Sequence, residues 1–134
     1  MQVTLAYGQT GLPVNLPDTT AVLQSRFVPG LADEAAAILA ALRQPMASPP
    51  LASLVKPGDN VVIVHSDITR ATPNDRILPV LLAELESAGV RRADITLLNA
   101  LGTHRRQTEA ELRKMLGDQS RTGRSAFDAD GRQR

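Results

Sequence analysis

Two apolar runs of the sequence are each followed by side chains that could do acid/base or anion-binding chemistry. Asp67 and Arg70 follow the run VVIVHS, and His104 follows the run ITLLNALGT. An arginine can bind a carboxylate or a phosphate through two parallel hydrogen bonds, and an aspartate beside it can orient the arginine or its ligand. A histidine can act as a general acid or base near neutral pH. Together these residue types indicate a site for an anionic substrate.

The same residues also have a purely structural interpretation. Asp67 and Arg70 could form a local ion pair that stiffens their loop, and His104 could be an ordinary exposed loop histidine. His65 differs from His104 because it lies inside the first apolar run. A histidine in that position is usually a core or sheet-edge residue that finds a backbone hydrogen-bond partner. We therefore expect His65 to have a structural role.

The elements predicted around these residues should place them at one edge of a sheet. From Val61 onward the pattern alternates strand, helix, strand and helix, which predicts parallel strands joined by a right-handed crossover. In such sheets ligands bind beyond the carboxyl ends of the strands, so Asp67, Arg70 and His104 should share one rim. The predicted fold class is α/β, a Rossmann-like parallel sheet with flanking helices.

Cap residues indicate where the two helices begin and end. Thr72 should cap a first helix that begins at Pro73, and Gly89 should close it. Thr108 and Glu111 have the spacing of a capping box at the start of the second helix.

The first 44 residues predict a small β unit followed by a helix. MQVTLAYG alternates apolar and polar residues, QTG supplies a turn and LPVNLP resumes an extended pattern, as expected of a β-hairpin. Residues 20–28 could add a third strand, and residues 31–44 are rich in the helix formers Ala and Leu. Residues 45–60 are punctuated by Pro, Ser and Gly, which is typical of a connector.

The composition is that of one globular domain. The chain has 134 residues, 43% of them hydrophobic and 22% charged, and its aromatic share of 2% requires a core of Leu, Val, Ile and Ala. There are no cysteines, so disulfides and thiolate metal sites are excluded. The N-terminus lacks a basic region followed by a long apolar stretch, and no apolar run approaches the roughly 20 residues of a membrane span. We expect a cytoplasmic protein without membrane contact.

The charge distribution argues against a nucleic-acid partner. Residues 1–90 hold 5 Lys and Arg against 8 Asp and Glu, whereas residues 91–134 hold 10 against 6. The basic excess at the end is interrupted by acids, and almost no aromatic side chain is present to stack on a base. The tail, residues 118–134, has no apolar period and is dense in Gly, Ser, Arg and Asp, so we expect it to be disordered or truncated.

Three stretches of the sequence resemble one known family. SDITRATPNDRILP and NALGTHRRQTEAEL match, in residue type, order and separation, the two motifs of the N-terminal domain of the nickel-dependent lactate racemase family, and GLPVNLP resembles its opening hairpin. The resemblance runs from about Met1 to Gly117, which we take as the N-terminal α/β domain. It implies one wall of a cleft for a nickel pincer nucleotide, a pyridinium mononucleotide that carries nickel between sulfur ligands.

The resemblance also implies roles for individual residues. By position, His104 would be one of two acid/base residues and would take the proton from the hydroxyl of a small 2-hydroxy acid such as lactate. Arg70 would contact the substrate, and Asp67 would support Arg70. Cofactor contacts are expected from four further residues, with the threonines near the phosphate: Thr69, Thr72, Gly102 and Thr103. No residue of this chain is expected to bind the metal.

The chain departs from the family pattern in two ways. Ala71 and Arg106 stand where the family commonly has proline, which loosens both loops. A second domain, which in the family supplies the cofactor lysine, the other acid/base histidine and the nickel-binding histidine, is not found. We therefore expect a detached N-terminal domain with little or no activity alone. The alternatives are a binding or assembly module for a separate second-domain chain, and an unrelated small phosphate- or nucleotide-binding protein.

Overall fold

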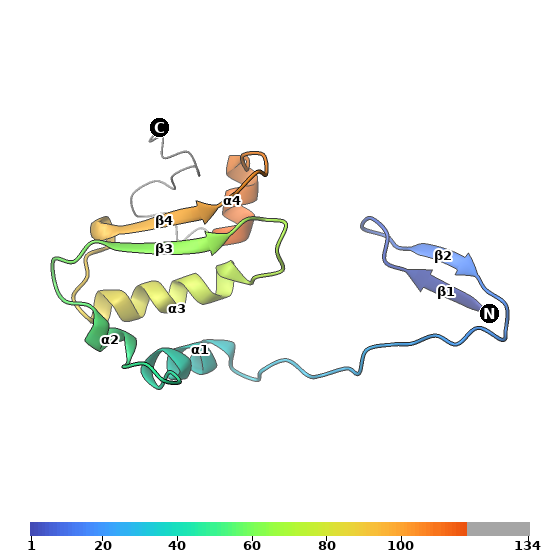
Figure 1. The fold of residues 1–134 in the computed structure, drawn as a ribbon, viewed down its shortest axis with the longest axis horizontal. Helices are drawn as coiled ribbons and strands as arrows, with labels where there is room; N and C mark the ends of the chain where they lie inside the picture. The colour runs from blue at the N-terminus through green and yellow to red at the C-terminus, as the bar shows by residue number, and fades with distance from the viewer. Residues whose placement is uncertain (118–134) are drawn as a thin grey trace. The chain divides into compact units, whose positions relative to one another are not determined.

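The computed structural model describes residues 1–117, and the predicted tail, residues 118–134, lies outside that range. The chain divides into two units, Met1–Gly30 and a larger one that begins at Leu31. Figure 1 shows the elements of both units.

The first unit is built around the predicted β-hairpin. Strands β1 (Gln2–Leu5) and β2 (Leu12–Asn15) pair antiparallel, with Val3 opposite Val14. The turn between them closes through a hydrogen bond from the Gly11 N–H to the Tyr7 carbonyl (2.9 Å). Gly11 has a φ of 77°, and a Cβ there would lie 2.8 Å from a methyl carbon of Thr4, so this turn favours glycine. The hairpin is confirmed.

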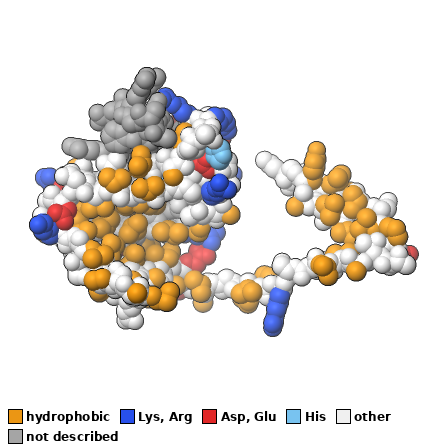
Figure 2. All heavy atoms as spheres, in the orientation of Figure 1, with side chains coloured by type: hydrophobic (Ala, Val, Ile, Leu, Met, Phe, Trp, Pro, Cys, Tyr) orange, Lys and Arg blue, Asp and Glu red, His pale blue; other side chains and the backbone are white. Residues whose placement is uncertain are grey.

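The prediction of a third strand over residues 20–28 is wrong. These residues hold no regular structure, and Leu23 and Phe27 are 96% and 84% exposed. Figure 2 shows hydrophobic side chains standing out from this part of the chain. An apolar, β-branched pattern favours an extended backbone, but a strand also needs a neighbouring backbone to pair with. Within the residues that the structure describes, this segment has none.

The second unit contains a two-stranded parallel sheet with helices against it. In chain order its elements are α1 (Glu34–Arg43), α2 (Leu51–Leu54), β3 (Val61–Ser66), α3 (Asn74–Ser87), the 3₁₀ turn η1 (Arg92–Asp94), β4 (Ile95–Ala100) and α4 (Glu109–Leu116). Strands β3 and β4 pair in parallel with Val61 opposite Ile95 and His65 opposite Asn99. The predicted α/β fold with a parallel sheet and an N-terminal hairpin is therefore confirmed.

The core of the second unit lies between the sheet and α3. Helix α3 runs along one face of the sheet, with α1 and α2 beyond it (Figure 1). The buried cluster consists of apolar side chains from α3, β4, α4 and the turn before β4: Leu78, Leu82, Leu85, Val90, Ile95, Leu97, Met115 and Leu116. On the other face of β3, Val62 and Val64 are exposed. This cluster contains no aromatic side chain and is built mostly from Leu, Val and Ile, as the composition required, with Met115 in addition.

The helix ends follow the predicted caps in part. Helix α4 begins with the complete capping box of Thr108 and Glu111. Helix α3 begins one residue later than predicted, because Pro73 and not Thr72 occupies its N-cap position and no side chain caps it. The Thr72 carbonyl instead accepts a hydrogen bond from the Asn74 N–H (2.8 Å), which tightens the entry to the helix.

No helix within residues 1–117 is long and apolar enough to cross a lipid bilayer.

Candidate functional site

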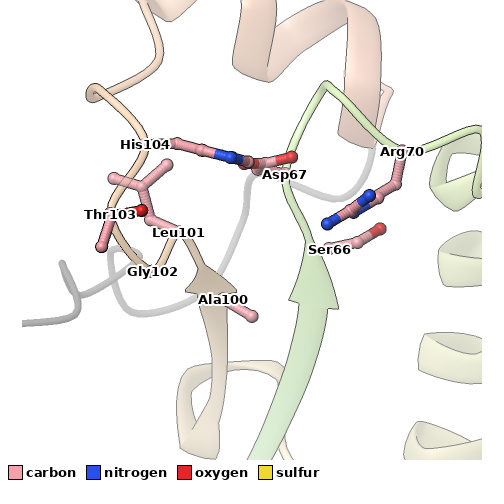
Figure 3. Close-up of a pocket in the computed structure, with 8 residues that line it drawn as sticks. All are labelled: Ser66, Asp67, Arg70, Ala100, Leu101, Gly102, Thr103 and His104. Atoms are coloured by element: carbon pink, nitrogen blue, oxygen red, sulfur yellow. The ribbon is translucent and has the colours of Figure 1, made fainter.

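A pocket of about 380 Å³ lies beyond the carboxyl ends of β3 and β4. Its walls come from Ser66, the last residue of β3, with Asp67 and Arg70 after it, and from residues 100–104, the first of which ends β4 (Figure 3). Because the strands are parallel and in register, the loops that follow them leave the same edge of the sheet. The structure therefore brings Asp67, Arg70 and His104 together, as the sequence predicted.

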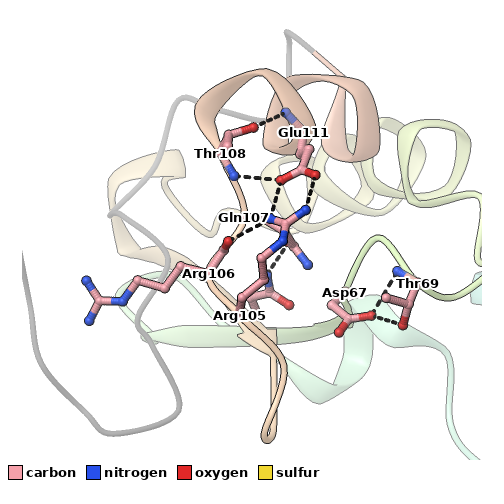
Figure 4. Close-up of polar contacts among 8 residues, drawn as sticks. Asp67, Thr69, Arg105, Arg106, Gln107, Thr108 and Glu111 are labelled. Atoms are coloured by element: carbon pink, nitrogen blue, oxygen red, sulfur yellow. Dashed lines mark hydrogen bonds and ion pairs between the residues drawn. The ribbon is translucent and has the colours of Figure 1, made fainter.

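Asp67 holds His104 in place. The side chain of Asp67 is 3% exposed, and its Oδ2 accepts a hydrogen bond from Nδ1 of His104. The other oxygen, Oδ1, accepts from the backbone N–H of Thr69 (3.0 Å) and from the Thr69 hydroxyl (2.6 Å), as Figure 4 shows. These contacts, the Thr69 hydroxyl first and His104 next, lower the pKa of Asp67 to about 2. Asp67 is therefore an ionised carboxylate at neutral pH.

The hydrogen bond to Asp67 determines which nitrogen of His104 is available. Since a carboxylate can only accept, a neutral His104 carries its proton on Nδ1 and has its lone pair on Nε2. His104 lines the pocket, its side chain is 46% exposed, and its Nε2 has no hydrogen-bond partner within residues 1–117. The arrangement is that of an oriented general base.

Arg70 lines the same pocket but does not pair with Asp67. Its backbone N–H donates to the Asp67 carbonyl (3.1 Å), whereas its exposed guanidinium has no hydrogen-bond or ion-pair partner within residues 1–117. This corrects one interpretation from the sequence, because no ion pair joins Asp67 to Arg70 within residues 1–117, and the contact between them is that backbone hydrogen bond. The guanidinium is left available for an anionic ligand.

The four residues expected to contact a cofactor divide into two pairs. Gly102 and Thr103 line the pocket, and a Cβ on Gly102 would meet no atom within 4 Å, so a ligand can approach the backbone there. Thr69 and Thr72 do not line the pocket. The Thr69 hydroxyl is occupied by Asp67, and Thr72 is exposed in the loop before α3.

His65 is buried, as expected of a strand histidine. Its Nδ1 donates to the backbone carbonyl of Ser66 (3.0 Å), and burial lowers the pKa of its imidazole. It is not among the residues that line the pocket.

Sequence reasoning did not single out Ser66, Ala100 or Leu101, which complete the pocket wall. Ser66 and Ala100 are the last residues of their strands, and strand-end position was the available signal. Residues 1–117 contain no group of three or more His, Cys, Asp or Glu side chains placed to bind a metal ion.

Comparisons with known proteins agree on one family. A family model described as the lactate racemase N-terminal domain matches residues 7–132. The lactate racemase of Thermoanaerobacterium thermosaccharolyticum is 30% identical in an alignment of 121 residues that covers 87% of this chain and 28% of that protein. The lactate racemase of Lactiplantibacillus plantarum is 39% identical over 77 residues, which are 58% of this chain and 18% of that protein.

A solved structure gives the same result for the fold. The lactate racemase apoprotein from Thermoanaerobacterium thermosaccharolyticum matches with a TM-score of 0.72 at 27% identity, covering 96% of this chain and 30% of that one. The chain therefore spans less than a third of the length of these relatives. The range matched by the family model continues past Gly117, the residue at which the motif resemblance was expected to end.

Proposed function

The chain belongs to the lactate racemase N-terminal domain family, and from this membership we propose that its pocket is part of the active site of a 2-hydroxy-acid racemase. One observation carries the proposal. A histidine oriented by a buried carboxylate and an arginine without a partner in residues 1–117 line a single pocket at the carboxyl edge of the sheet. A carboxylate and a 2-hydroxyl are the two groups that such a pocket would recognise.

In this proposal His104 is the acid/base residue. Nε2 takes the proton of the substrate 2-hydroxyl, and the resulting imidazolium is stabilised by the Asp67 carboxylate at Nδ1. The family resemblance implies two acid/base residues, so His104 would take or return this proton for one enantiomer and the second histidine would do so for the other. Asp67 remains ionised throughout, since its pKa is held at about 2.

Arg70 binds and orients the substrate. Its guanidinium would hold the carboxylate of a 2-hydroxy acid such as lactate through two parallel hydrogen bonds, which places the adjacent hydroxyl toward His104. Thr69 has a supporting role in this scheme, because its hydroxyl and N–H fix the carboxylate that orients His104.

A nickel pincer nucleotide would supply the hydride acceptor that racemisation needs. The described residues do not fit a nickel site by themselves, because residues 1–117 present no cluster of metal-binding side chains. We propose that the metal ligands come from elsewhere in a complete enzyme and that Gly102 and Thr103 contact only the organic part of the cofactor. We also propose that the protein is cytoplasmic, as the sequence predicted.

Reconstitution tests this function. The full 134-residue chain would be combined with the part of the Thermoanaerobacterium thermosaccharolyticum racemase that lies beyond the matched region, loaded with its cofactor, and interconversion of L- and D-lactate would be followed. We expect activity, and we expect His104→Ala to lower it by about 10²–10⁴-fold.

Lys114→Ala is the control, because Lys114 is exposed on α4 and does not line the pocket. No racemisation by the unmodified pair, with both parts shown to be folded, would contradict the proposal. Equal losses from His104→Ala and Lys114→Ala would also contradict it.

A further inference from the structure

His104 lies in the loop that joins β4 to α4, and this loop must hold a particular shape for the imidazole to reach Asp67. Gly102 has a positive φ of 59°, and the His104 N–H donates to the Leu101 carbonyl (3.1 Å), which closes one turn. Residues 101–107 contain no proline to restrict the backbone after that turn. Side-chain contacts made by the loop residues after His104 therefore have to restrict the loop backbone.

The first such contact joins Arg105 to Glu111. The guanidinium of Arg105 donates to both carboxylate oxygens of Glu111 (3.0 and 2.7 Å) and to the Arg106 carbonyl (2.9 Å), as Figure 4 shows. Glu111 also accepts from the Thr108 N–H (2.8 Å) in the capping box of α4. The residue directly after His104 is thus tied to the first turn of a helix, and neither Arg105 nor Glu111 lines the pocket.

The second contact joins the two ends of the loop. Asn99, on β4, donates from Nδ2 to Oε1 of Gln107 (2.6 Å), just before the helix cap. Asn99 is buried and opposite His65 in the sheet register, so its position is fixed by the strands. Gln107 is therefore anchored to the sheet, while Arg105 is anchored to α4.

We infer that Glu111 and Gln107 are positioning residues for His104. Glu111 acts through Arg105, and Gln107 acts through Asn99. We call these two contacts the latch, which keeps Nδ1 of His104 hydrogen-bonded to Asp67 and leaves Nε2 available to the pocket. Neither residue lines the pocket. The inference rests on the proposed function, in which His104 is the acid/base group, and it adds a reason why this loop holds one geometry.

The test is a measurement of the His104 tautomer by ¹⁵N NMR on the full 134-residue chain, at a pH where the imidazole is neutral. Glu111→Gln is the decisive variant, because glutamine still serves in a capping box while the ion pair with Arg105 is lost. Gln107→Ala removes the other contact. Glu86→Gln is the matched control, since Glu86 also forms a two-bond ion pair with an arginine, Arg92 (2.8 and 3.0 Å), and neither residue belongs to the loop or lines the pocket.

We expect Nδ1–H to dominate in the unmodified chain and the ratio of Nδ1–H to Nε2–H to fall by about 2- to 10-fold in Glu111→Gln and in Gln107→Ala, which is the range of one net hydrogen bond. Glu86→Gln should leave the ratio unchanged. An unchanged ratio in both latch variants would overturn the inference. So would loss of the dispersed amide spectrum in Glu111→Gln, because Glu111 would then be a folding residue.

Asp67→Asn separates this inference from the proposed function. If Asp67→Asn shifts the tautomer ratio and the latch variants do not, the latch is wrong and the acid/base pair stands. If Asp67→Asn also leaves the ratio unchanged, the Asp67–His104 pair does not orient the histidine, and both proposals fail.

Discussion

Asp67 is the residue that connects the two loops of the site. Its carboxylate is buried and accepts hydrogen bonds from the Thr69 N–H, the Thr69 hydroxyl and His104 Nδ1. Such contacts must offset the free energy lost when the carboxylate is removed from water, because burial of an unpaired charge is costly. Here the compensation also orients the base, so stability and the proposed chemistry depend on the same oxygen atoms.

The lowered pKa of Asp67 predicts a pH dependence of stability. The pKa falls from 3.8 to about 2 on folding, so between these values the unfolded chain binds more protons at this position than the folded chain. The contribution of Asp67 to the free energy of unfolding is therefore full above about pH 4 and is lost as the pH falls through about 2. Urea unfolding between pH 2 and 5 should show that the stability difference between the unmodified chain and Asp67→Asn shrinks as the pH falls.

Glu111 does not complicate this comparison. Its pKa is also lowered to about 2, first by the hydrogen bond from Arg105, and it contributes in the same direction. Because Glu111 is present in both proteins, its contribution cancels in the difference. A difference that stays constant from pH 5 to pH 2 would show that the pKa of Asp67 is not lowered.

Arg70→Lys tests the proposed role of Arg70 in substrate binding. An ammonium cannot form the two parallel bonds of a guanidinium to a carboxylate, so we expect lactate to bind the chain about tenfold more weakly. Chemical-shift titration of the backbone amides with L-lactate would measure the dissociation constant. Arg76→Lys is the control, since Arg76 is paired with Glu34 (2.7 Å) and does not line the pocket. An equal effect of both substitutions would mean that Arg70 is not the binding residue.

At the scale of elements, the turns that reverse the chain are as important as the strands. Helix α3 runs back antiparallel to β3, and a tight turn at Gly89 then leads the chain toward β4. Gly89 has a φ of 93°, and a Cβ there would lie 2.7 Å from Cγ of Pro57. The turn therefore needs glycine for two reasons, the backbone conformation and the contact with the connector before β3.

A pair of glycine substitutions separates these two reasons. Gly58 has a similar φ of 90°, but a Cβ there would meet nothing within 4 Å. Gly58→Ala should cost about 1–2 kcal/mol of unfolding free energy from the backbone alone. Gly89→Ala should cost at least about 1 kcal/mol more, because Pro57 must move. Urea unfolding at neutral pH would measure both, and equal losses would show that the contact with Pro57 is relieved without cost.

At the scale of the whole molecule, all of the buried apolar cluster belongs to the second unit. Its members run from Leu78 to Leu116, and the side chains packed against them begin at Leu51. The first unit, Met1–Gly30, keeps large apolar side chains exposed, among them Tyr7, Leu23 and Phe27. Stability of the sheet and its site should therefore depend on the second unit alone.

Removal of residues 1–30 tests this independence. A chain that begins at Leu31 should retain the circular dichroism of the α/β unit and unfold cooperatively, with a loss within about 0.5 kcal/mol, as for changes far from a core. Its His104 tautomer should match that of the full chain. Loss of cooperative unfolding would mean that the second unit does not fold by itself.

What the sequence determined by itself was local or periodic. The apolar runs that became β3 and β4, the capping box of Thr108 and Glu111, and the opening hairpin were all predicted, because each depends on residues close together in the chain. The shared rim of Asp67, Arg70 and His104 also followed, since parallel strands present their carboxyl ends at one edge.

Only the tertiary structure decided which of these residues are partners. Asp67 and Arg70 are three positions apart and suggested an ion pair, yet Asp67 bonds to His104, 37 residues away. That contact exists because β3 and β4 pair in register and the loop after β4 turns back toward Asp67, and no local pattern encodes either the register or the loop's path. In the same way residues 20–28 had the composition of a strand but no partner within residues 1–117, because strand formation depends on a neighbouring backbone that composition does not specify.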